Sequence, residues 1–245
     1  MKVVCLGATR GMGRALARAL AARGESLCLL GRDPVELERS ARDLEAHGAP
    51  APVSVTACDL LDPDGFDAAL DRAAVALDGF DTVIVTAGLF GTQDELERDT
   101  KRRRDVLRAN FVNTVEFCEA ARTRLLARGG GTLCVFSSVA GERGRKPVVL
   151  YGAAKAGLTR YLEGLDHRYR ADGLVTITVK PGFVRTRMTA ELDPPPFVGE
   201  PDDVAVAVVR ALDRGTPVVY APAIWRVVMT LIRTLPRAVM RRVGF

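Results

Sequence analysis

A tyrosine and a lysine four positions apart are the residues of this sequence best suited to moving a proton. Tyr151 and Lys155 lie at the start of a helical pattern over 151–171, and positions i and i+4 share one face of a helix. A free tyrosine has a pKa near ~10, and a nearby ammonium favours the phenolate and lowers that pKa. The pair therefore predicts a cleft in which Tyr151 exchanges a proton with a bound substrate.

A glycine-rich turn near the start of the chain is the second chemical feature. Gly7, Gly11 and Gly13 follow the apolar run 2–6 and open a helical pattern over 12–23. Glycine allows a tight turn and lets backbone N–H groups approach a pyrophosphate at the helix N-terminus. The place of this turn between a strand and a helix indicates dinucleotide binding.

The loop after the second predicted strand, 26–30, is where such a nucleotide's ribose 2′ position is recognised. NAD-specific sites carry a carboxylate there, whereas an arginine accommodates a 2′-phosphate. Arg32 occupies the first loop position, and Arg10 in the glycine turn adds a second positive charge. The pattern favours NADP(H) over NAD(H), although the neighbouring Asp33 leaves NAD(H) open.

The elements that must position these residues alternate along the chain. Strands are predicted at 2–6, 26–30, 52–56, 82–86, 132–136, 175–179 and 217–220, and helices at 12–23, 34–47, 64–77, 101–127, 151–171 and 201–213. This alternation predicts an α/β fold, a doubly wound Rossmann-type sheet of seven parallel strands with helices on both faces. We expect one domain over 1–245, with ligands bound at the carboxyl ends of the strands.

The Gly-x-x-x-Gly-x-Gly spacing of the turn resembles that of the short-chain dehydrogenase/reductase family. Four further landmarks occur in the order of that family across nearly the whole chain. They are Asp59-Leu60 after the third strand, Ala87-Gly88 after the fourth, Ser138 with Tyr151 and Lys155, and the turn 181–186. One departure is Val85-Thr86 in place of the usual paired asparagines, which puts a supporting hydrogen bond in doubt.

The resemblance implies a role for each matching residue. Ser138 would donate a hydrogen bond to the substrate oxygen and Tyr151 would protonate it, while Lys155 would hold the nicotinamide ribose. Asn110 would support the lysine through water. The implied cofactor contacts are Gly7, Thr9, Arg10, Gly11, Met12, Gly13, Arg32, Asp59, Leu60, Ala87, Gly88, Tyr151, Lys155, Pro181, Gly182, Val184 and Thr186. No metal is expected.

These residues predict an NADPH-dependent carbonyl reductase that turns a ketone into a secondary alcohol. An NAD-dependent alcohol dehydrogenase and a 3-oxoacyl or polyketide ketoreductase are alternatives within the family. A non-catalytic NADP(H)-binding sensor or scaffold is the alternative outside it, which the intact Asn110, Ser138, Tyr151 and Lys155 argue against. We expect a homo-oligomer acting on a small-molecule or lipid-linked ketone.

The net charge of +5 is concentrated at the C-terminal end. Six arginines follow Asp213 with no acid among them, so the rest of the chain carries a formal charge of −1, which argues against a nucleic-acid partner. An odd number of widely spaced cysteines, five in all, fits a reducing cytoplasm.

The segment 222–245 is predicted to be a basic amphipathic extension, divided in two at Pro236. Its apolar face is expected to hold Ile224, Val227, Val228, Leu231 and Leu235. Such a face predicts either peripheral contact with the inner face of a membrane through 223–242, or a helix that closes the core or an oligomer interface. The segments 137–143, 151–158 and 181–190, with this basic tail, also resemble the actinobacterial enzymes that reduce a decaprenylphosphoryl 2-keto-pentose.

Overall fold

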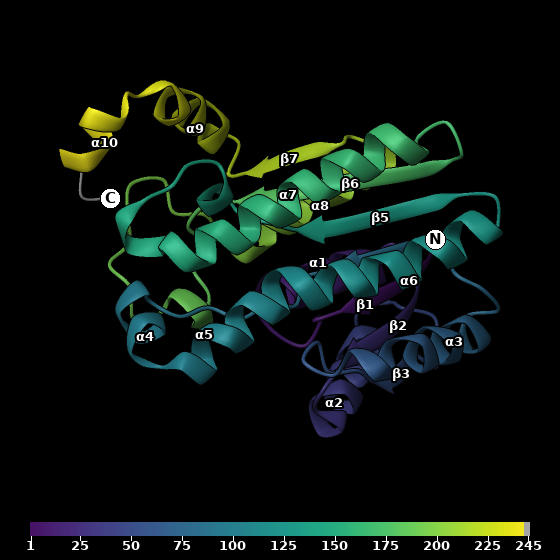
Figure 1. Cartoon of the computed structure of the whole chain (residues 1–245). Helices are drawn as coiled ribbons and strands as arrows, with labels where there is room; N and C mark the ends of the chain where they lie inside the picture. The colour runs from purple at the N-terminus through teal and green to yellow at the C-terminus, as the bar shows by residue number, and fades with distance from the viewer. Residues whose placement is uncertain (243–245) are drawn as a thin grey trace.

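The computed structural model describes residues 1–242, and seven strands form the sheet at its centre (Figure 1). The strands are β1 (Lys2–Leu6), β2 (Ser26–Gly31), β3 (Ser54–Ala57), β4 (Thr82–Val85), β5 (Gly131–Phe136), β6 (Leu174–Pro181) and β7 (Val218–Ala221). Their order is β3-β2-β1-β4-β5-β6-β7, and every neighbouring pair is parallel. The predicted sheet is therefore confirmed.

Helices cover both faces of this sheet because alternate strand side chains point to opposite sides. Val3 and Cys5 of β1 belong to one buried cluster, whereas Val4 and Leu6 belong to the other. The first cluster is closed by α1 (Gly11–Ala21), α2 (Pro34–Ala46) and α8 (Pro201–Arg214), and the second by α3 (Phe66–Ala76), α6 (Asn113–Ala127) and α7 (Val149–Tyr169). Strands buried on both faces explain the unbroken apolar runs in the sequence.

The strand order reverses at β1, which lies between β2 and β4. The connections that leave β1 and β4 therefore run to opposite sides and leave a crevice at the carboxyl ends of these strands, where such sheets bind ligands. Thus the glycine turn after β1 and the segment that follows β4 meet at one place.

The predicted helix over 101–127 is divided in the structure. It consists of α5 (Thr100–Leu107), a π-helical turn η2 (Arg108–Val112) and α6, and a further short helix, α4 (Gln93–Arg98), precedes it. The α4 helix begins with a capping box in which Thr92 and Glu95 bond each other's backbone N–H groups. That Thr-x-x-Glu signal was present in the sequence and was missed.

The C-terminal segment forms α9 (Ile224–Thr234) and α10 (Arg237–Arg242), so the predicted break at Pro236 is confirmed. The sequence left open whether the predicted apolar face would meet a membrane or the protein, and in the structure three of its five residues are exposed. Ile224, Val227 and Leu231 are 40%, 57% and 64% exposed, whereas Trp225 and Met229 are buried against Val139. Residues 243–245 of the predicted extension lie outside the described residues.

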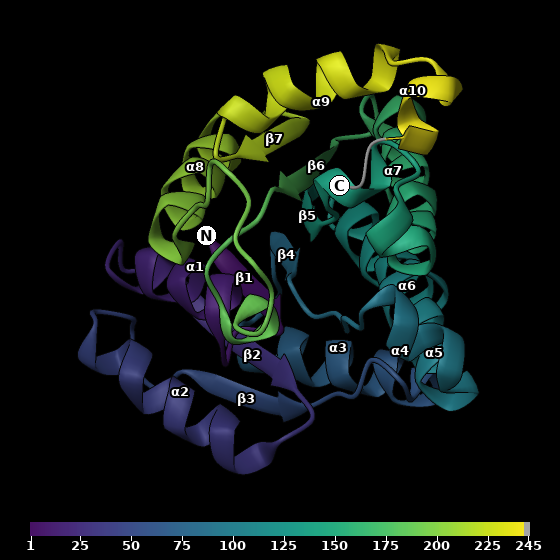
Figure 2. The same cartoon turned by 90° about the vertical axis from the view of Figure 1, so that its left-hand side faces the viewer.

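A buried carboxylate attaches this segment to the loop after β5. Glu142 accepts hydrogen bonds from Lys180 Nζ at 2.6 Å, Arg233 Nη1 at 3.1 Å and Tyr220 Oη at 3.2 Å. Arg143 Nη2 donates to the carbonyl oxygen of Leu235 at 2.7 Å. One side of α9 therefore closes the core, while its other side remains exposed across one end of the molecule (Figure 2). Within residues 1–242, no helix combines the length and the hydropathy needed to cross a bilayer.

Candidate active site

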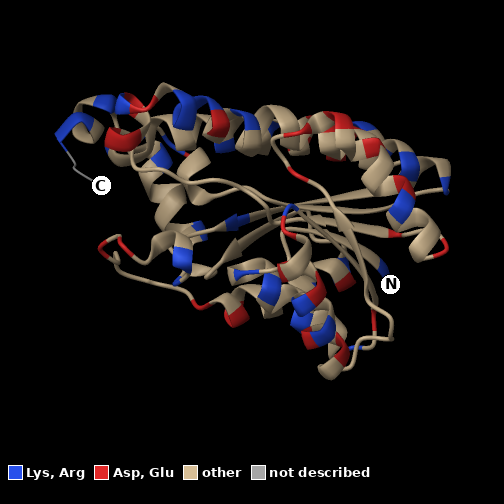
Figure 3. Cartoon of the chain, turned by 90° about the horizontal axis from the view of Figure 1, so that it is seen from below, with Lys and Arg blue, Asp and Glu red and all other residues tan. Residues whose placement is uncertain are grey.

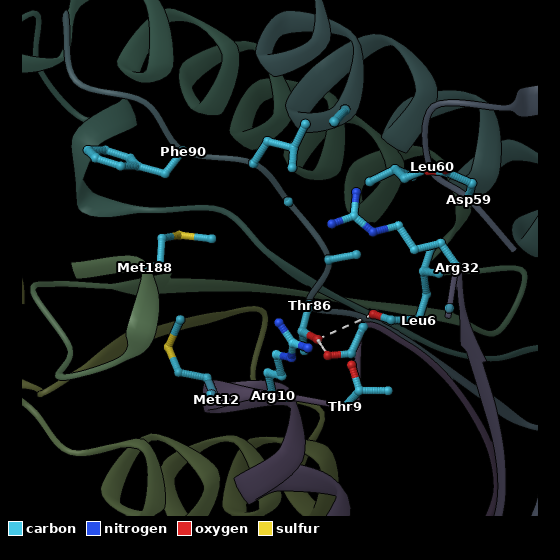
Figure 4. Close-up of a pocket in the computed structure, with 18 of the residues that line it drawn as sticks. Leu6, Thr9, Arg10, Met12, Arg32, Asp59, Leu60, Thr86, Phe90 and Met188 are labelled. Carbon is cyan, nitrogen blue, oxygen red and sulfur yellow. Dashed lines mark hydrogen bonds between the residues drawn. The ribbon is translucent and has the colours of Figure 1, made fainter. Parts of the chain in front are cut away.

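A cavity of about 550 Å³ opens at the crevice beside β1 and β4 (Figure 4). Twelve of the residues predicted to contact a cofactor line it: Gly7, Thr9, Arg10, Gly11, Met12, Gly13, Arg32, Asp59, Leu60, Ala87, Gly88 and Thr186. They come from five separate segments of the sequence. The fold therefore brings most of the predicted nucleotide contacts to one place.

Close packing explains two of the glycines in the turn. A Cβ at Gly7, whose φ is +98°, would lie 2.5 Å from the Ala87 nitrogen. A Cβ at Gly13 would lie 2.3 Å from the carbonyl oxygen of Gly7 and 2.4 Å from Thr86 Oγ1. No side chain fits in either place, so the first turn of α1 lies directly against the end of β4. The helix N-terminus that results is suited to a pyrophosphate.

Thr86 supplies the hydrogen bond that the departure from the family pattern had put in doubt. Its Oγ1 lies 3.0 Å from the carbonyl oxygen of Gly7 and 3.2 Å from that of Leu6, and donates toward both (Figure 4). A short hydroxyl side chain therefore fastens the glycine turn to β4.

Arg10 and Arg32 extend toward the middle of the cavity from opposite walls (Figure 4). Asp33 is engaged elsewhere, because its carboxylate caps α2 and accepts from the backbone N–H groups of Val35 at 3.1 Å and Glu36 at 3.2 Å. Glu36 Oε2 is 4.0 Å from Arg10 Nη2, a contact that is largely solvated. The cavity thus presents two guanidinium groups where the ribose 2′ position is expected.

Lys155 is buried at the opposite end of the crevice. Its Nζ donates to the carbonyl oxygen of Phe136 at 2.8 Å and lies 5.9 Å from the centroid of the Tyr151 ring. Ser138 follows β5 and caps a short 3₁₀ turn, η3 (Val139–Gly141). The ends of β5 and α7 thus bring Ser138, Tyr151 and Lys155 into one region.

Asn110 lies in the π-helical turn, an irregularity that is common at functional sites. Its Nδ2 donates to the carbonyl oxygens of Leu89 at 2.6 Å and Val106 at 2.9 Å, and its Oδ1 accepts from the Leu89 N–H at 3.3 Å. A Cβ at Gly88 would lie 2.6 Å from this Oδ1 and 3.8 Å from Lys155 Nζ. Asn110 therefore holds the segment after β4 beside the lysine.

The charge balance of the tyrosine–lysine pair differs from the sequence expectation. Burial raises the pKa of Tyr151 to about 12, and its hydrogen bond with Ser138 opposes that rise. Burial also lowers the pKa of Lys155 to about 8. The expected lowering of the tyrosine pKa by the ammonium is therefore wrong for this structure, because removal from water is the largest influence and Ser138, not Lys155, opposes it.

Three predicted contacts lie away from the cavity wall. A Cβ at Gly182 would meet Trp225 Nε1 at 2.1 Å, and Val184 is buried in the core. Pro181 ends β6. None of the three is among the lining residues of the described cavity, nor are Tyr151 and Lys155. Their contact with the nicotinamide stays a prediction.

The structure adds lining residues that the sequence reasoning missed. Two of them, Phe90 and Met188, lie with the predicted contact Met12 at the end of the cavity opposite Asp59 and Leu60 (Figure 4). The Phe90 ring packs edge-on against Tyr151, with ring centroids 5.2 Å apart. The other additions are Leu6, Gly31, Cys58, Leu61, Thr86, Leu89, Arg102, Ala109 and Arg187. Phe90 lies in a loop without a recognisable motif. Met188 lies in the short 3₁₀ helix η5 (Arg187–Thr189), just after the turn 181–186 in which contacts were predicted.

Comparisons with known proteins agree with this geometry. The sequence profile of the short chain dehydrogenase family matches residues 1–196. An uncharacterized oxidoreductase of Streptomyces coelicolor is 36% identical over 98% of this chain and 94% of its own length, and carbonyl reductase family member 4 of Xenopus laevis is 26% identical over 87% and 92%. A crystal structure of a variant actinorhodin polyketide ketoreductase with NADPH has a TM-score of 0.80 at 20% identity, covering 89% of this chain and 94% of that one.

The low pKa of Lys155 predicts a pH-dependent contribution to stability. The unfolded lysine, with a pKa near ~10.4, binds a proton between about pH 8 and pH 10 that the folded lysine does not. Stability rises with pH where the unfolded chain binds more protons. The free energy of unfolding of the wild type, relative to Lys155→Met, should therefore rise by about 2 kcal/mol between about pH 7 and pH 10. Urea unfolding of both proteins measures this, and a constant difference would contradict it.

Proposed function

Because the chain belongs to the short-chain dehydrogenase/reductase family, we propose that this oxidoreductase reduces a ketone to a secondary alcohol with NADPH. The observation that carries the proposal is that the dinucleotide-type cavity adjoins the catalytic pair, because Phe90 and Gly88 line it and lie beside Tyr151 and Lys155. The glycine turn, Arg10 and Arg32 would hold the nucleotide, which supplies hydride when bound.

The residues of the chain would polarise the carbonyl group and complete the reduction. Ser138 and Tyr151 would donate hydrogen bonds to the carbonyl oxygen, where negative charge develops as hydride arrives. Tyr151 would then give that oxygen its proton, for which a pKa of about 12 keeps the phenol protonated at neutral pH. Lys155 would contact the ribose and favour the phenolate that is left. The intact catalytic group argues against the alternative of a non-catalytic NADP(H)-binding sensor or scaffold.

The preference for NADPH over NADH is supported by the charges around the ribose position. Arg10 and Arg32 enter the cavity, and the carboxylate of Asp33 is already occupied by two backbone N–H groups of α2. A phosphate forms strong, forked hydrogen bonds with guanidinium groups. An NAD-dependent dehydrogenase would need a free carboxylate in this loop to hold the ribose 2′-hydroxyl, and the carboxylate of Asp33 is engaged by α2.

The substrate region is apolar where Phe90 packs on Tyr151 and Met188 lines the cavity. This lining supports a ketone with an apolar portion, and a lipid-linked 2-keto sugar or an acyl or polyketide ketone each has one. The tail favours the lipid-linked sugar, because Ile224, Val227 and Leu231 form an exposed apolar row on α9. Five arginines of α9 and α10, with no acid among them, would accompany that row to an anionic membrane surface (Figure 3).

A homo-oligomer is part of the proposal. Phe111 and Val112 of η2 and Val149 of α7 are exposed large apolar residues on the same side of the sheet. A second copy of the chain would remove them from water.

The chemical role of the tyrosine is tested by Tyr151→Phe. Removing one hydroxyl should leave NADPH affinity unchanged but slow carbonyl reduction by about 100-fold or more, because the proton donor is lost. Tyr169→Phe, which removes a hydroxyl at the far end of α7, is the matched control and should keep full activity. Initial rates with a panel of ketones, and NADPH titrations by fluorescence, measure both effects. Undiminished turnover in Tyr151→Phe would mean that the proton comes from another group.

The cofactor preference is tested by Arg32→Ala. Wild-type protein should bind NADPH at least about tenfold more tightly than NADH, since a charge-assisted contact contributes about 1.5–3 kcal/mol. The difference in affinity between NADPH and NADH should become smaller in Arg32→Ala. It should persist in Arg39→Ala, which changes an exposed residue of α2 outside the cavity. Equal affinities of the wild type for the two cofactors, measured by calorimetry, would refute the assignment.

The membrane contact is tested on two residues of α9 that face opposite ways. Leu231→Gln, at an exposed position, should keep the melting temperature and weaken sedimentation with phosphatidylglycerol vesicles at low salt. Met229→Ala, at a fully buried position, should instead lower the free energy of unfolding by about 2–5 kcal/mol. If the wild type does not sediment with these vesicles at low salt, the exposed row does not serve a membrane.

A further inference from the structure

A second cavity, of about 740 Å³, lies on the far side of α7 from the catalytic pair. Its walls are the loop that follows Ser138, the first turns of α7 and the helix α10, which lies beside the start of α7 in both views (Figures 1 and 2). Val149, Gly152, Ala153 and Ala156 share the α7 face that lines it, whereas Tyr151 and Lys155 point away. The nucleotide cavity shares none of these residues.

The cavity is positively charged on two of its three walls, the loop and α10, while the α7 wall is uncharged. Its basic residues are Arg143, Arg145, Lys146, Arg237 and Arg241, and no aspartate or glutamate is among the described residues that line it. Within residues 1–242, none of the five has a carboxylate oxygen within 4.0 Å. The one acid of the adjoining loop, Glu142, is already engaged by Lys180 and Arg233.

Arg145 is the most costly of these cations. Within residues 1–242, its Nε atom is buried without a hydrogen-bond partner, and burial lowers the pKa of its guanidinium. A buried, unpaired donor on a charged group is unfavourable unless a partner compensates it. Lys146, Arg237 and Arg241 are exposed, so water weakens their mutual repulsion, and they add positive charge to the space beside Arg145. The buried nitrogen of Arg145 is therefore the feature that most favours an anion in this cavity.

We propose that this cavity is a binding site for a phosphate group, separate from the nucleotide site. Arginine forks match the geometry of phosphate oxygens, and Arg145 and Arg241 approach the space from the loop and from α10. The phosphate can belong to a free anion or to a lipid headgroup. The site rests on its own residues and does not depend on the reductase function.

A ligand here would act on the segment that positions the catalytic hydroxyls. Ala140 lines the cavity, and its N–H donates to Ser138 Oγ at 3.1 Å. A Cβ at Gly152 would lie 2.8 Å from the carbonyl oxygen of Ala140, so the loop and α7 are packed backbone against backbone. An anion that joins the loop to α10 therefore fixes the segment from which Ser138 projects.

Binding is measured on the full-length protein with saturating NADP⁺, so that the nucleotide site is filled. The same measurement on the Arg10→Ala/Arg32→Ala double variant excludes binding at the nucleotide site. Pyrophosphate and dihexanoyl phosphatidic acid are titrated separately by calorimetry. Arg241→Gln should weaken binding by about tenfold. Arg242→Gln is the matched control, with the same charge change at the next residue, which does not line the cavity.

Saturable binding that Arg241→Gln weakens and Arg242→Gln does not would support the site. Tighter binding of pyrophosphate would then identify a free anion, and tighter binding of phosphatidic acid a lipid headgroup. Arg145→Gln should weaken the same binding, and Lys146→Gln provides a second, exposed variant if Arg145→Gln fails to fold. The proposal is overturned if neither probe binds, or if Arg241→Gln and Arg242→Gln have equal effects.

Discussion

The glycine turn packs against the segment that follows β4 with no room for a side chain, and the positions of the other groups depend on this packing. Without side chains at Gly7 and Gly13, the turn and the start of α1 lie against Ala87 and Thr86, and the Thr86 hydroxyl fastens the two segments. Beyond Thr86, the chain passes Gly88, where Asn110 leaves no room for a Cβ and Lys155 lies close by. A series of contacts between small residues therefore connects the nucleotide end of the crevice with its catalytic end, and a bulky residue at any of these points would separate them.

The same dense packing sets the electrostatics of the catalytic pair. Lys155 is almost wholly removed from water and its Nζ bonds a neutral carbonyl oxygen, so its charged form is disfavoured. Tyr151 is kept neutral by burial for the corresponding reason. A phenol that stays protonated at neutral pH suits a step in which it donates a proton. A negative charge near Lys155, on Tyr151 or on a bound ligand, would favour the ammonium form of the lysine. The protonation states of Tyr151 and Lys155 would then depend on each other.

The sequence predicted the fold correctly where a residue pattern has a single structural explanation. Unbroken apolar runs such as 2–6 and 26–30 are typical of strands buried on both faces, and the parallel arrangement of the sheet followed from their alternation with helices. The sequence could not decide the orientation of α9, because Trp225 and Met229 form a second apolar row beside Ile224, Val227 and Leu231. Periodicity alone does not say which apolar row finds a partner, and in the structure the Trp225 ring packs over Gly182. Phe90 and Met188 carried no periodic signal.

Glu142 decides which of the cations near the C-terminal end have a carboxylate partner. Glu142 lies beside a region rich in arginine, and its two oxygens are occupied by Lys180, Tyr220 and Arg233, which fix α9. The bonds that attach the tail therefore use the only carboxylate of the loop, and the cations on the other side of that loop are left without one. Surface cations in this situation usually extend into water at little cost. Arg145 does not, since its Nε is buried. A buried guanidinium nitrogen with no partner within residues 1–242 is unfavourable, and an anion in the adjoining cavity would give it one.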